Sequence, residues 1–344
     1  MPSSGYRVGV LGATGAVGST ILEVLAERDF PASEVVAFTS ERSAGTRLEW
    51  NGSVLECRPL EEGSIAGFDL ILSSAGGAVS AEWAPRLVEA GAVVVDNTSY
   101  WRMHEDVPLV VAEVNPDAAA AHSGIVANPN CTTMQMVLAL APIHRAATLE
   151  RLVVSTYQSV SGTGRRAVEE LRLQSRAVLD GAEPDPPEVY PHRIAFNVLP
   201  QVEAFKDGDD YTTEERKVMA ETRKILGLGE EVGISATCAR VPVFTGHSES
   251  VNVQTREDLS PEECRALLAG APGIVVVDEP GEGRYPLPTD VAGRDEVLVG
   301  RVRRDPGQAR CLNLWVVGDN LRKGAATNAV QVAELLLERG LLRG

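Results

Sequence analysis

The sequence predicts an α/β protein in two parts, an N-terminal doubly wound parallel sheet and an α+β region built on an open mixed sheet. Over residues 1–130, short apolar runs alternate with helical stretches. From Leu152 onward, strand-like runs follow one another more closely and the helices carry mixed charges. A length of 344 residues also suits two domains of ordinary size.

The first part is predicted to consist of five strands with helices between them. Strands are expected at residues 6–11, 35–39, 70–73, 93–96 and 124–127, and helices at residues 19–27 and 81–90. The run at 6–11 is continuously apolar, which is typical of a parallel strand covered on both faces. Strands alternating with helices in this way give a doubly wound sheet with right-handed crossovers.

The second part is predicted to be an open mixed sheet carrying helices. Strands are expected at residues 152–158, 235–243, 250–254, 274–278, 297–302 and 311–317, and helices at residues 165–179 and 213–226. The segment 181–191 is rich in proline and acidic residues, so we expect a surface loop. An amphipathic helix at 325–336 is expected to fold back on the first domain. The predicted domains are therefore residues 1–130 with the C-terminal helix segment 321–344, and residues 131–320.

Composition excludes several classes of protein. No apolar run approaches the roughly 20 residues that cross a bilayer, and the N-terminus lacks the pattern of a signal peptide, so a cytoplasmic protein is expected. The five cysteines form no CxxC pair, which disfavours a metal site. A net charge of −16 disfavours nucleic acid as a partner. Any anionic substrate must therefore be held by local arginine and lysine residues.

A glycine loop follows the first strand and opens the first helix. In the segment Gly12-Ala13-Thr14-Gly15-Ala16-Val17-Gly18, the first glycine permits a tight turn and the second a close approach to a pyrophosphate. The third allows the helix to pack closely on the strand, and the helix N-terminus attracts the anion. The sequence therefore predicts a Rossmann-type dinucleotide site that uses Gly12, Thr14, Gly15, Ala16 and Val17.

The end of the second strand bears on the choice of dinucleotide. It continues into Ser40, Glu41, Arg42 and Ser43. Hydroxyl groups and an arginine suit the 2′-phosphate of NADP, whereas an acidic residue at this place usually holds the ribose of NAD. We therefore expect NADP, bound by Ser40, Arg42 and Ser43, and Glu41 keeps NAD open as an alternative.

Cys131 is the candidate nucleophile. It follows an Asn-Pro-Asn turn and lies just before an apolar helix expected from Met134, and a helix N-terminus lowers the pKa of a thiol. A buried structural cysteine is the alternative, which the loop position disfavours. A thiolate beside a nicotinamide would add to an aldehyde to give a thiohemiacetal. Loss of hydride would then leave a thioester for an acceptor nucleophile to cleave.

Five segments, taken in order, resemble the bacterial type of aspartate-semialdehyde dehydrogenase across nearly the whole chain. They are Gly12–Gly15, Asn128–Thr133, Gln158–Gly162, Arg240–His247 and Gly318–Ala325. The resemblance implies reversible NADP-dependent reductive dephosphorylation of L-aspartyl 4-phosphate to L-aspartate 4-semialdehyde through a cysteine thioester. It also implies a place in lysine, diaminopimelate, threonine and methionine biosynthesis. A homodimer or homotetramer built on the second domain follows from it, with inorganic phosphate as a partner and neither nucleic acid nor membrane.

The resemblance also implies the roles of individual residues. Cys131 matches the acylated nucleophile, His247 the acid/base group and Gln158 the residue that orients the substrate. Three residues match the substrate-binding positions, namely Arg240 for the α-carboxylate, Glu214 for the ammonium group, and Asn130. Phosphate binding is implied for Arg102 and Lys217. Contact with the nicotinamide half of the cofactor is implied for Ser161, Gly162 and Asn320. Arg216 stands where family members often have tryptophan, and Thr98 and Tyr100 replace the commoner serine and alanine.

Two alternative functions remain open from the sequence. One is another acyl-phosphate reductase, acting on N-acetyl-γ-glutamyl phosphate or glyceraldehyde 3-phosphate. The first of these typically has an NPGCY-like segment, whereas this chain has Asn130-Cys131-Thr132. The other alternative is a non-catalytic homologue that only binds a dinucleotide, but such a protein should have lost the thiol or the histidine.

Overall fold

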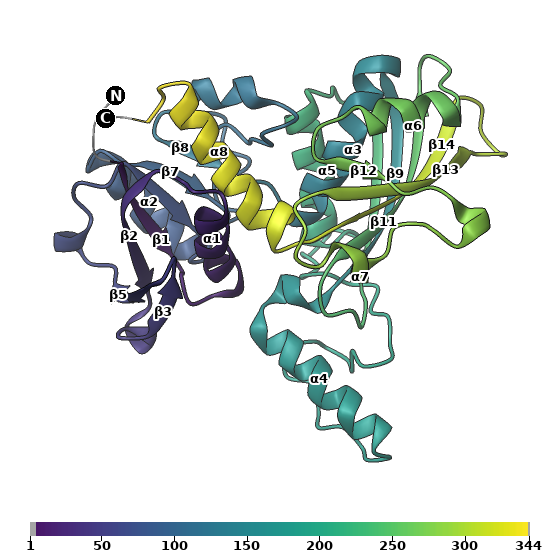
Figure 1. The fold of residues 1–344 in the computed structure, drawn as a ribbon. Coiled ribbons are helices and arrows are strands. Elements are labelled where there is room, and N and C mark those ends of the chain that lie inside the picture. Colours follow the sequence, from purple (N-terminus) through teal and green to yellow (C-terminus); the bar gives the residue numbers. More distant parts are fainter. Residues whose placement is uncertain (1–4, 343–344) are drawn as a thin grey trace. The chain divides into compact units, whose positions relative to one another are not determined.

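The computed structural model describes residues 5–342, which divide into two compact units (Figure 1). The first unit contains the residues up to Asn130 together with those from Ala325 onward, and the second is Cys131–Gly324. The expectation drawn from the N-terminal stretch falls partly on residues 1–4, which lie outside the described residues, as do residues 343–344. Within residues 5–342, no helix is both long and apolar enough to cross a membrane.

The first unit is the predicted parallel sheet, but it has six strands rather than five because the short strand β5 was not predicted. The strands run in the order β5-β2-β1-β6-β7-β8, and every pairing between them is parallel. Their bounds are β1 (Tyr6–Leu11), β2 (Ala32–Thr39), β5 (Arg58–Pro59), β6 (Leu70–Ser73), β7 (Val93–Asp96) and β8 (Ile125–Ala127). A separate hairpin is formed by β3 (Arg47–Trp50) and β4 (Ser53–Glu56).

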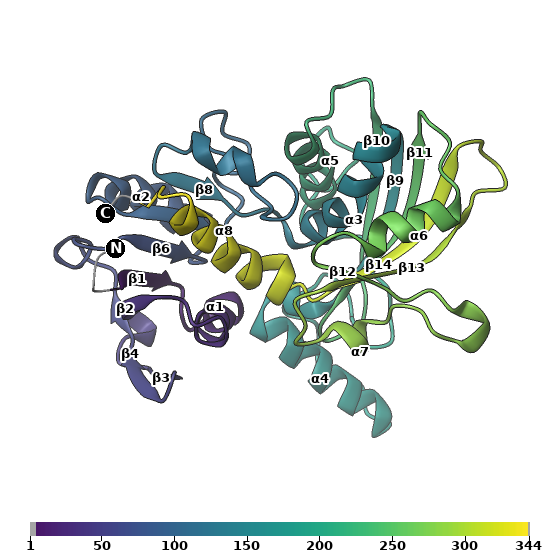
Figure 2. The same cartoon turned by 45° about the horizontal axis from the view of Figure 1, so that its top comes forward.

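Helices cover both faces of this sheet. On one face, Val8 and Val10 of β1 share an apolar cluster with side chains of α1 (Ala16–Glu27) and α8 (Thr327–Glu338). On the other face, Leu11 and Ile71 pack with α2 (Gly77–Glu89). Because successive side chains of a strand point to opposite faces, this alternation gives the doubly wound arrangement. The contact between α1 and α8 brings residues from the two ends of the chain together (Figure 2).

The second unit is an open mixed sheet in the order β10-β9-β11-β14-β13-β12. The pairs β10–β9 and β12–β13 are parallel, and the other three are antiparallel. The strands are β9 (Leu149–Gln158), β10 (Gly233–Arg240), β11 (His247–Thr255), β12 (Ile274–Val276), β13 (Val297–Arg304) and β14 (Cys311–Gly318), and the helices are α3 (Cys131–Ala147), α4 (Arg165–Leu179), α5 (Thr213–Leu226), α6 (Pro261–Ala269) and α7 (Pro288–Val291). The fold class predicted from the sequence is confirmed in both units.

Several boundaries differ from those predicted. Strand β10 ends at Arg240 rather than at residue 243, because Pro242 has no N–H to continue the ladder. Strand β11 begins at His247, three residues earlier than predicted, and α3 begins at Cys131 rather than at Met134. These shifts place the candidate nucleophile and the candidate acid/base histidine at the ends of regular elements.

Candidate active site

Cys131 and His247 meet at the beginning of two elements of the second unit. Cys131 is the first residue of α3, and His247 is the first residue of β11. The Cys131 Sγ and the His247 Nε2 lie 3.3 Å apart. The unsatisfied N–H groups of the first helical turn favour negative charge on the sulfur. The pair therefore has the arrangement of a nucleophile and its hydrogen-bonding partner.

The other four cysteines have no such surroundings. Cys57, Cys238, Cys264 and Cys311 are buried, whereas Cys131 is partly exposed. Burial raises the pKa of all four buried thiols, that of Cys264 to about 12. Because the thiolate is the reactive form, these four are inert by comparison.

Hydrogen bonding fixes the tautomer of His247. The main-chain N–H of Ser159 donates to the His247 Nδ1 at 3.0 Å, and the Ser159 Oγ lies 3.1 Å from the same atom. The His247 side chain is fully buried, and its pKa is well below the ordinary value, first because of burial and second because of the nearby Arg240. A neutral ring that accepts at Nδ1 must carry its proton on Nε2. The structure therefore directs an N–H of the imidazole at the Cys131 sulfur.

The register of the sheet explains why residues distant in sequence meet here. Arg240 ends β10 beside Gln158, which ends the parallel strand β9, and His247 begins β11 opposite Gly318, the last residue of β14. Strand β11 runs antiparallel to β9, so its beginning lies at the edge of the sheet where β9 ends. We call this row of Arg240, Gln158, His247 and Gly318 the upper row. It brings three of the candidate site residues together.

Arg240 is held in place with one donor still available. Its side chain is buried, and Nη1 donates to the Ser159 carbonyl at 2.7 Å. Its Nε is buried and has no hydrogen-bond partner within the described residues. A Cβ at Gly162 would lie 3.3 Å from the Arg240 Nη1 and 3.2 Å from the His247 Nε2. Gly162 therefore borders the space between these two groups.

Gln158 connects the upper row to α5. Its Nε2 donates to the Glu214 Oε1 at 3.0 Å, and both side chains are buried. The Glu214 Oε2 lies 3.8 Å from the Lys217 Nζ, which also bonds Glu203. The start of α5 is fixed by a capping box formed by Thr212 and Glu215. The predicted substrate residues Gln158 and Glu214 are thus in direct contact, with Lys217 beside them.

Asn320 is a scaffold for the loops around His247. Its Oδ1 accepts from the Ser159 Oγ at 3.0 Å and from the Gly246 main chain at 3.0 Å, and its Nδ2 donates to the Ser161 Oγ at 2.9 Å. The predicted cofactor residues Ser161 and Asn320 are therefore hydrogen-bonded to each other and to the segment that precedes His247. Ser159 lies within the Gln158–Gly162 motif but has no predicted role, and the structure shows that it bonds both His247 and Arg240.

The glycine loop of the first unit borders a cavity of about 300 Å³. Gly12, Thr14, Gly15 and Ser40 are among the residues that line it. Gly12 has a positive φ of 77°, and a Cβ there would approach the Ser74 carbonyl oxygen to 2.9 Å, so only glycine fits this turn. Residues Ala16 and Val17 form the first turn of α1. This cradle fits the pyrophosphate of a dinucleotide.

The remaining predicted residues of the first unit lie outside that cavity lining. Arg42 and Ser43 belong to a short 3-10 helix, Glu41–Ser43, directly after Ser40, and Arg42 is exposed. The Arg102 guanidinium is buried and donates to the main-chain oxygens of Asn128 at 3.0 Å and Asn97 at 2.7 Å. Asn130 is buried and immediately precedes Cys131 in the chain.

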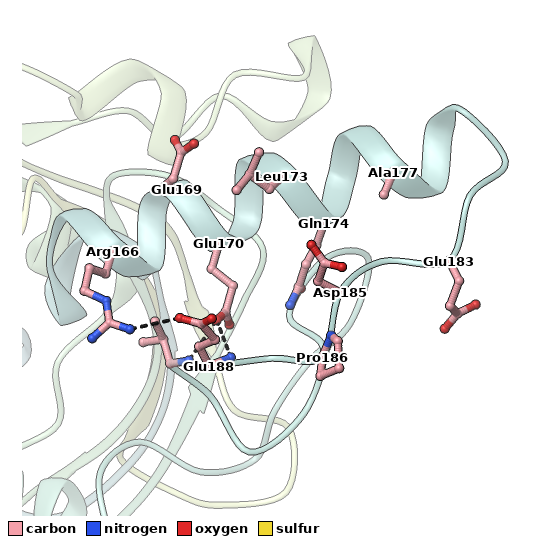
Figure 3. A pocket seen from close by; sticks show the side chains of 11 residues that line it. Arg166, Glu169, Glu170, Leu173, Gln174, Ala177, Glu183, Asp185, Pro186 and Glu188 are labelled. Atoms are coloured by element: carbon pink, nitrogen blue, oxygen red, sulfur yellow. Dashed lines mark hydrogen bonds and ion pairs between the residues drawn. The ribbon is translucent and has the colours of Figure 1, made fainter.

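A larger cavity of about 380 Å³ lies beside α4 but contains none of the predicted site residues (Figure 3). Its lining includes the acidic residues Glu169, Glu170, Glu183, Asp185 and Glu188, and Arg166 pairs with Glu188 at 3.1 Å. Within the described part of the chain, no group of three or more histidine, cysteine or acidic residues could hold a metal ion.

Each of the two units matches a family model of semialdehyde dehydrogenases. Residues 7–122 match the family model described as "Semialdehyde dehydrogenase, NAD binding domain". Residues 140–323 match the model described as "Semialdehyde dehydrogenase, dimerisation domain". The first match supports a nicotinamide dinucleotide as the cofactor, and the second supports an oligomer.

Individual proteins agree with these matches. The chain is 52% identical over 341 residues to aspartate-semialdehyde dehydrogenase of Aquifex aeolicus, covering 98% of this chain and 100% of that protein. It is similar in structure to aspartate semialdehyde dehydrogenase II from Vibrio cholerae complexed with ASA, with a TM-score of 0.94, 46% identity and coverage of 98% and 99%. The enzyme with NADP from Candida albicans gives a TM-score of 0.73 at 25% identity, covering 98% of this chain and 100% of that one.

Proposed function

Because the chain belongs to the aspartate-semialdehyde dehydrogenase family, we propose that it interconverts L-aspartyl 4-phosphate and L-aspartate 4-semialdehyde with NADP as the cofactor. The observation that carries the proposal is the contact of 3.3 Å between the Cys131 Sγ and the His247 Nε2 at the N-terminus of α3. It supports covalent catalysis at carbonyl carbon, which is the chemistry this reaction requires.

In the oxidative direction, the Cys131 thiolate adds to the aldehyde carbon and gives a thiohemiacetal oxyanion. The Nε2–H of His247 first stabilises the thiolate and then the oxyanion, both as a hydrogen-bond donor. When bound, the nicotinamide of the cofactor accepts or supplies the hydride at this carbon. In this tautomer His247 can donate the proton on Nε2. To accept a proton at Nε2, the ring must first carry its own proton on Nδ1, and the Ser159 N–H must then leave Nδ1. The predicted acid/base role therefore involves a change at the Ser159 contact.

The substrate is proposed to bind across the upper row. The buried Arg240 Nε lacks a hydrogen-bond partner within the described residues. A substrate carboxylate bound at Arg240 would accept a hydrogen bond from this Nε, so the donor would be satisfied when substrate is bound. Glu214 would meet the ammonium group, with Gln158 orienting the reacting end and Asn130 assisting from the residue before the nucleophile. Gln158 and Glu214 are already joined by a hydrogen bond of 3.0 Å, so the substrate meets a rigid pair.

Phosphate is proposed to be the acceptor that cleaves the thioester, with Arg102 and Lys217 converging on it. The Lys217 amino group is shared with Glu203 and Glu214, so it can turn to an incoming anion by leaving Glu203. A charge-assisted contact contributes roughly 1.5 to 3 kcal/mol. Loss of either side chain should therefore raise the KM for phosphate about tenfold to a hundredfold, with a smaller effect on the aldehyde.

The units are proposed to divide the work at the boundaries that the sequence predicts. Residues 1–130 with 321–344 would bind NADP, and residues 131–320 would carry catalysis and the contacts of a homodimer or homotetramer. Ser40, Arg42 and Ser43 are proposed to hold the 2′-phosphate, and Ser161, Gly162 and Asn320 to contact the nicotinamide half. The presence of both Cys131 and His247 argues against a non-catalytic homologue. The segment Asn130-Cys131-Thr132 argues against N-acetyl-γ-glutamyl phosphate as the substrate.

The proposal is tested by Cys131→Ser with L-aspartate 4-semialdehyde, phosphate and NADP⁺. We expect turnover to fall at least about a hundredfold because a serine hydroxyl is not ionised at neutral pH, while NADP⁺ binding is retained. In the unmodified enzyme, mass spectrometry should find an acyl adduct on Cys131 when phosphate is withheld. Cys264→Ser, which alters a buried thiol, is the control and should keep its activity. Substantial turnover by Cys131→Ser would exclude the thioester route.

A further inference from the structure

Glu249 is a buried acid directly below His247. It lies two residues further along β11, so both side chains point to the same face of the sheet. The Glu249 side chain is fully buried, and neither carboxyl oxygen has a hydrogen-bond partner among the described residues. An ionised carboxylate in such a place is very costly, so the charge state of this group needs an explanation.

The register places Glu249 in a second row of the sheet. It lies opposite Thr156 of β9 and opposite Val316 of β14, and Thr156 in turn lies opposite Cys238 of β10. We call Cys238, Thr156, Glu249 and Val316 the lower row. All four are buried. The other charged groups known to face this row are acidic, since Glu214 and Glu215 of α5 act on the Cys238 thiol together with Glu249.

Gln135 lies between this acid and the nucleophile. It is on α3, four residues after Cys131, so it faces the same side of the helix one turn further along. Its Nε2 donates to the main-chain oxygen of His247 at 3.2 Å, whereas its Oε1 is buried and has no partner within the described residues. The Gln135 side chain also acts on the Glu249 carboxyl, where it lowers the pKa against the larger, opposite effect of burial. A Cβ at Gly318 would lie only 2.8 Å from the Gln135 Oε1, so this amide is closely packed.

A single proton on Glu249 would provide a hydrogen bond between the Glu249 carboxyl and the Gln135 Oε1. An ionised Glu249 that accepted from the Gln135 Nε2 would take this donor away from the His247 carbonyl, and the Oε1 would remain unpaired. A protonated Glu249 donates to the Oε1 while the Nε2 stays on His247. We infer that Glu249 is a neutral carboxylic acid that donates to Gln135 and, through it, positions the His247 main chain against the helix that bears Cys131.

Burial raises the pKa of Glu249 well above its ordinary value, in agreement with this charge state. The chain of contacts runs from Glu249 to the Gln135 amide and on to the His247 main chain, so it ties the first turn of α3 to the first residue of β11. Glu249 is thus a positioning residue for the Cys131–His247 pair. This second part of the inference depends on the function proposed above, whereas the protonation of Glu249 does not.

The protonation is tested by urea unfolding of the unmodified chain and of E249Q between pH 5.5 and 7.5. A folded-state pKa above the unfolded value means that the native protein keeps a proton that the unfolded chain releases above about pH 4.3. The folding equilibrium constant of the unmodified chain, relative to that of E249Q, should therefore fall about tenfold for each pH unit. A ratio that does not change with pH would show that Glu249 is ionised in the folded protein and would overturn the inference.

The positioning role is tested with E249Q and E249L. The amide of E249Q can still donate to the Gln135 Oε1, so its kcat should stay within about threefold of the unmodified enzyme, whereas E249L should lose about tenfold or more. The pH midpoint for alkylation of Cys131 by iodoacetamide should move in E249L and not in E249Q. Cys238→Ala, in the same lower row, is the control for a general disturbance of the core.

The outcomes distinguish the charge state of Glu249 from its positioning role. If the unfolding ratio follows pH but E249L leaves the alkylation midpoint and kcat unchanged, the acid is neutral and has no positioning role, so that part is wrong. If E249L does not fold, the pH dependence measured with E249Q still decides the charge state. If the chain shows no turnover with L-aspartate 4-semialdehyde, the proposed function fails, while the unfolding and alkylation results remain interpretable.

Discussion

Gly162→Ala should disable the site by adding a single methyl group. The backbone at Gly162 does not have a positive φ, so alanine can adopt its conformation without strain. The added Cβ would lie 3.2 Å from the His247 Nε2 and 3.3 Å from the Arg240 Nη1. Both distances are shorter than an ordinary van der Waals contact, so one of the two groups must move.

Neither neighbour moves freely. The Arg240 Nη1 is bonded to the Ser159 carbonyl at 2.7 Å, and the His247 ring is held between the Ser159 N–H at 3.0 Å and the Cys131 Sγ at 3.3 Å. Forcing an extra methyl group into a packed site costs about 1–3 kcal/mol. Taken up in the catalytic pair, this corresponds to a loss of roughly 5- to 150-fold in kcat/KM.

The measurement is the rate of reduced-nicotinamide formation from L-aspartate 4-semialdehyde, phosphate and NADP⁺. Gly281→Ala is the matched control, because that glycine also lies in a 3-10 helix and has no other atom within 4 Å of the added Cβ. The same overpacking should lower the free energy of unfolding of the variant by no more than about 1–3 kcal/mol, so the variant should remain folded in the assay. A kcat/KM within twofold of the unmodified enzyme would show that the space between Arg240 and His247 is not where the substrate reacts.

Three further changes probe other parts of the site. Arg240→Lys should raise the KM for the aldehyde sharply, because a point charge cannot both hold the Ser159 carbonyl and grip a carboxylate, and an unchanged KM in steady-state assays would remove Arg240 from the substrate site. Arg42→Ala should weaken binding of NADP⁺ and leave NAD⁺ nearly unaffected, which titration of the two cofactors measures; equal kcat/KM for both cofactors in the unmodified enzyme would favour NAD. His247 is neutral in the fold and its pKa is lowered, so the unfolded chain binds a proton below about pH 6.5 that the native protein does not. Below that pH, the free energy of unfolding of the unmodified enzyme should therefore fall by up to about 1.4 kcal/mol per pH unit relative to that of His247→Gln. Urea unfolding measures this, and the same pH dependence in both proteins would contradict it.

Much of the fold could be predicted because apolar periodicity is a strong local signal. The buried strands β1, β6 and β7 match their predicted bounds, as do the helices α4 and α5 with their marked polar and apolar faces. The hairpin β3–β4 and the helix α6 were not predicted although local signals for them exist. The hairpin β3–β4 turns at Asn51 and Gly52, both with positive φ, as the Asn-Gly pair favours. Helix α6 begins with a capping box formed by Ser260 and Glu263.

The site could be predicted only in part, because sequence identifies groups but not their hydrogen bonds. Cys131 and His247 stand out by residue type and motif, and the structure adds that Ser159 sets the tautomer. Gln135 and Glu249 carry no comparable signal, since a glutamine in an apolar helix and a glutamate in a strand are usually solvated. Their importance arises from the pairing register of β11 with β9 and β14, which no local pattern specifies.

The division of the first unit between the two ends of the chain has a consequence for its synthesis. Side chains of α8, such as Val330 and Leu336, complete the apolar cluster that β1 and α1 begin. A nascent chain therefore carries Val8, Val10 and Ile21 without part of their apolar neighbours until Val330 and Leu336 have left the ribosome. We expect the second unit, whose residues are contiguous from Cys131 to Gly324, to be able to fold first, and the dinucleotide-binding unit to be the last to close.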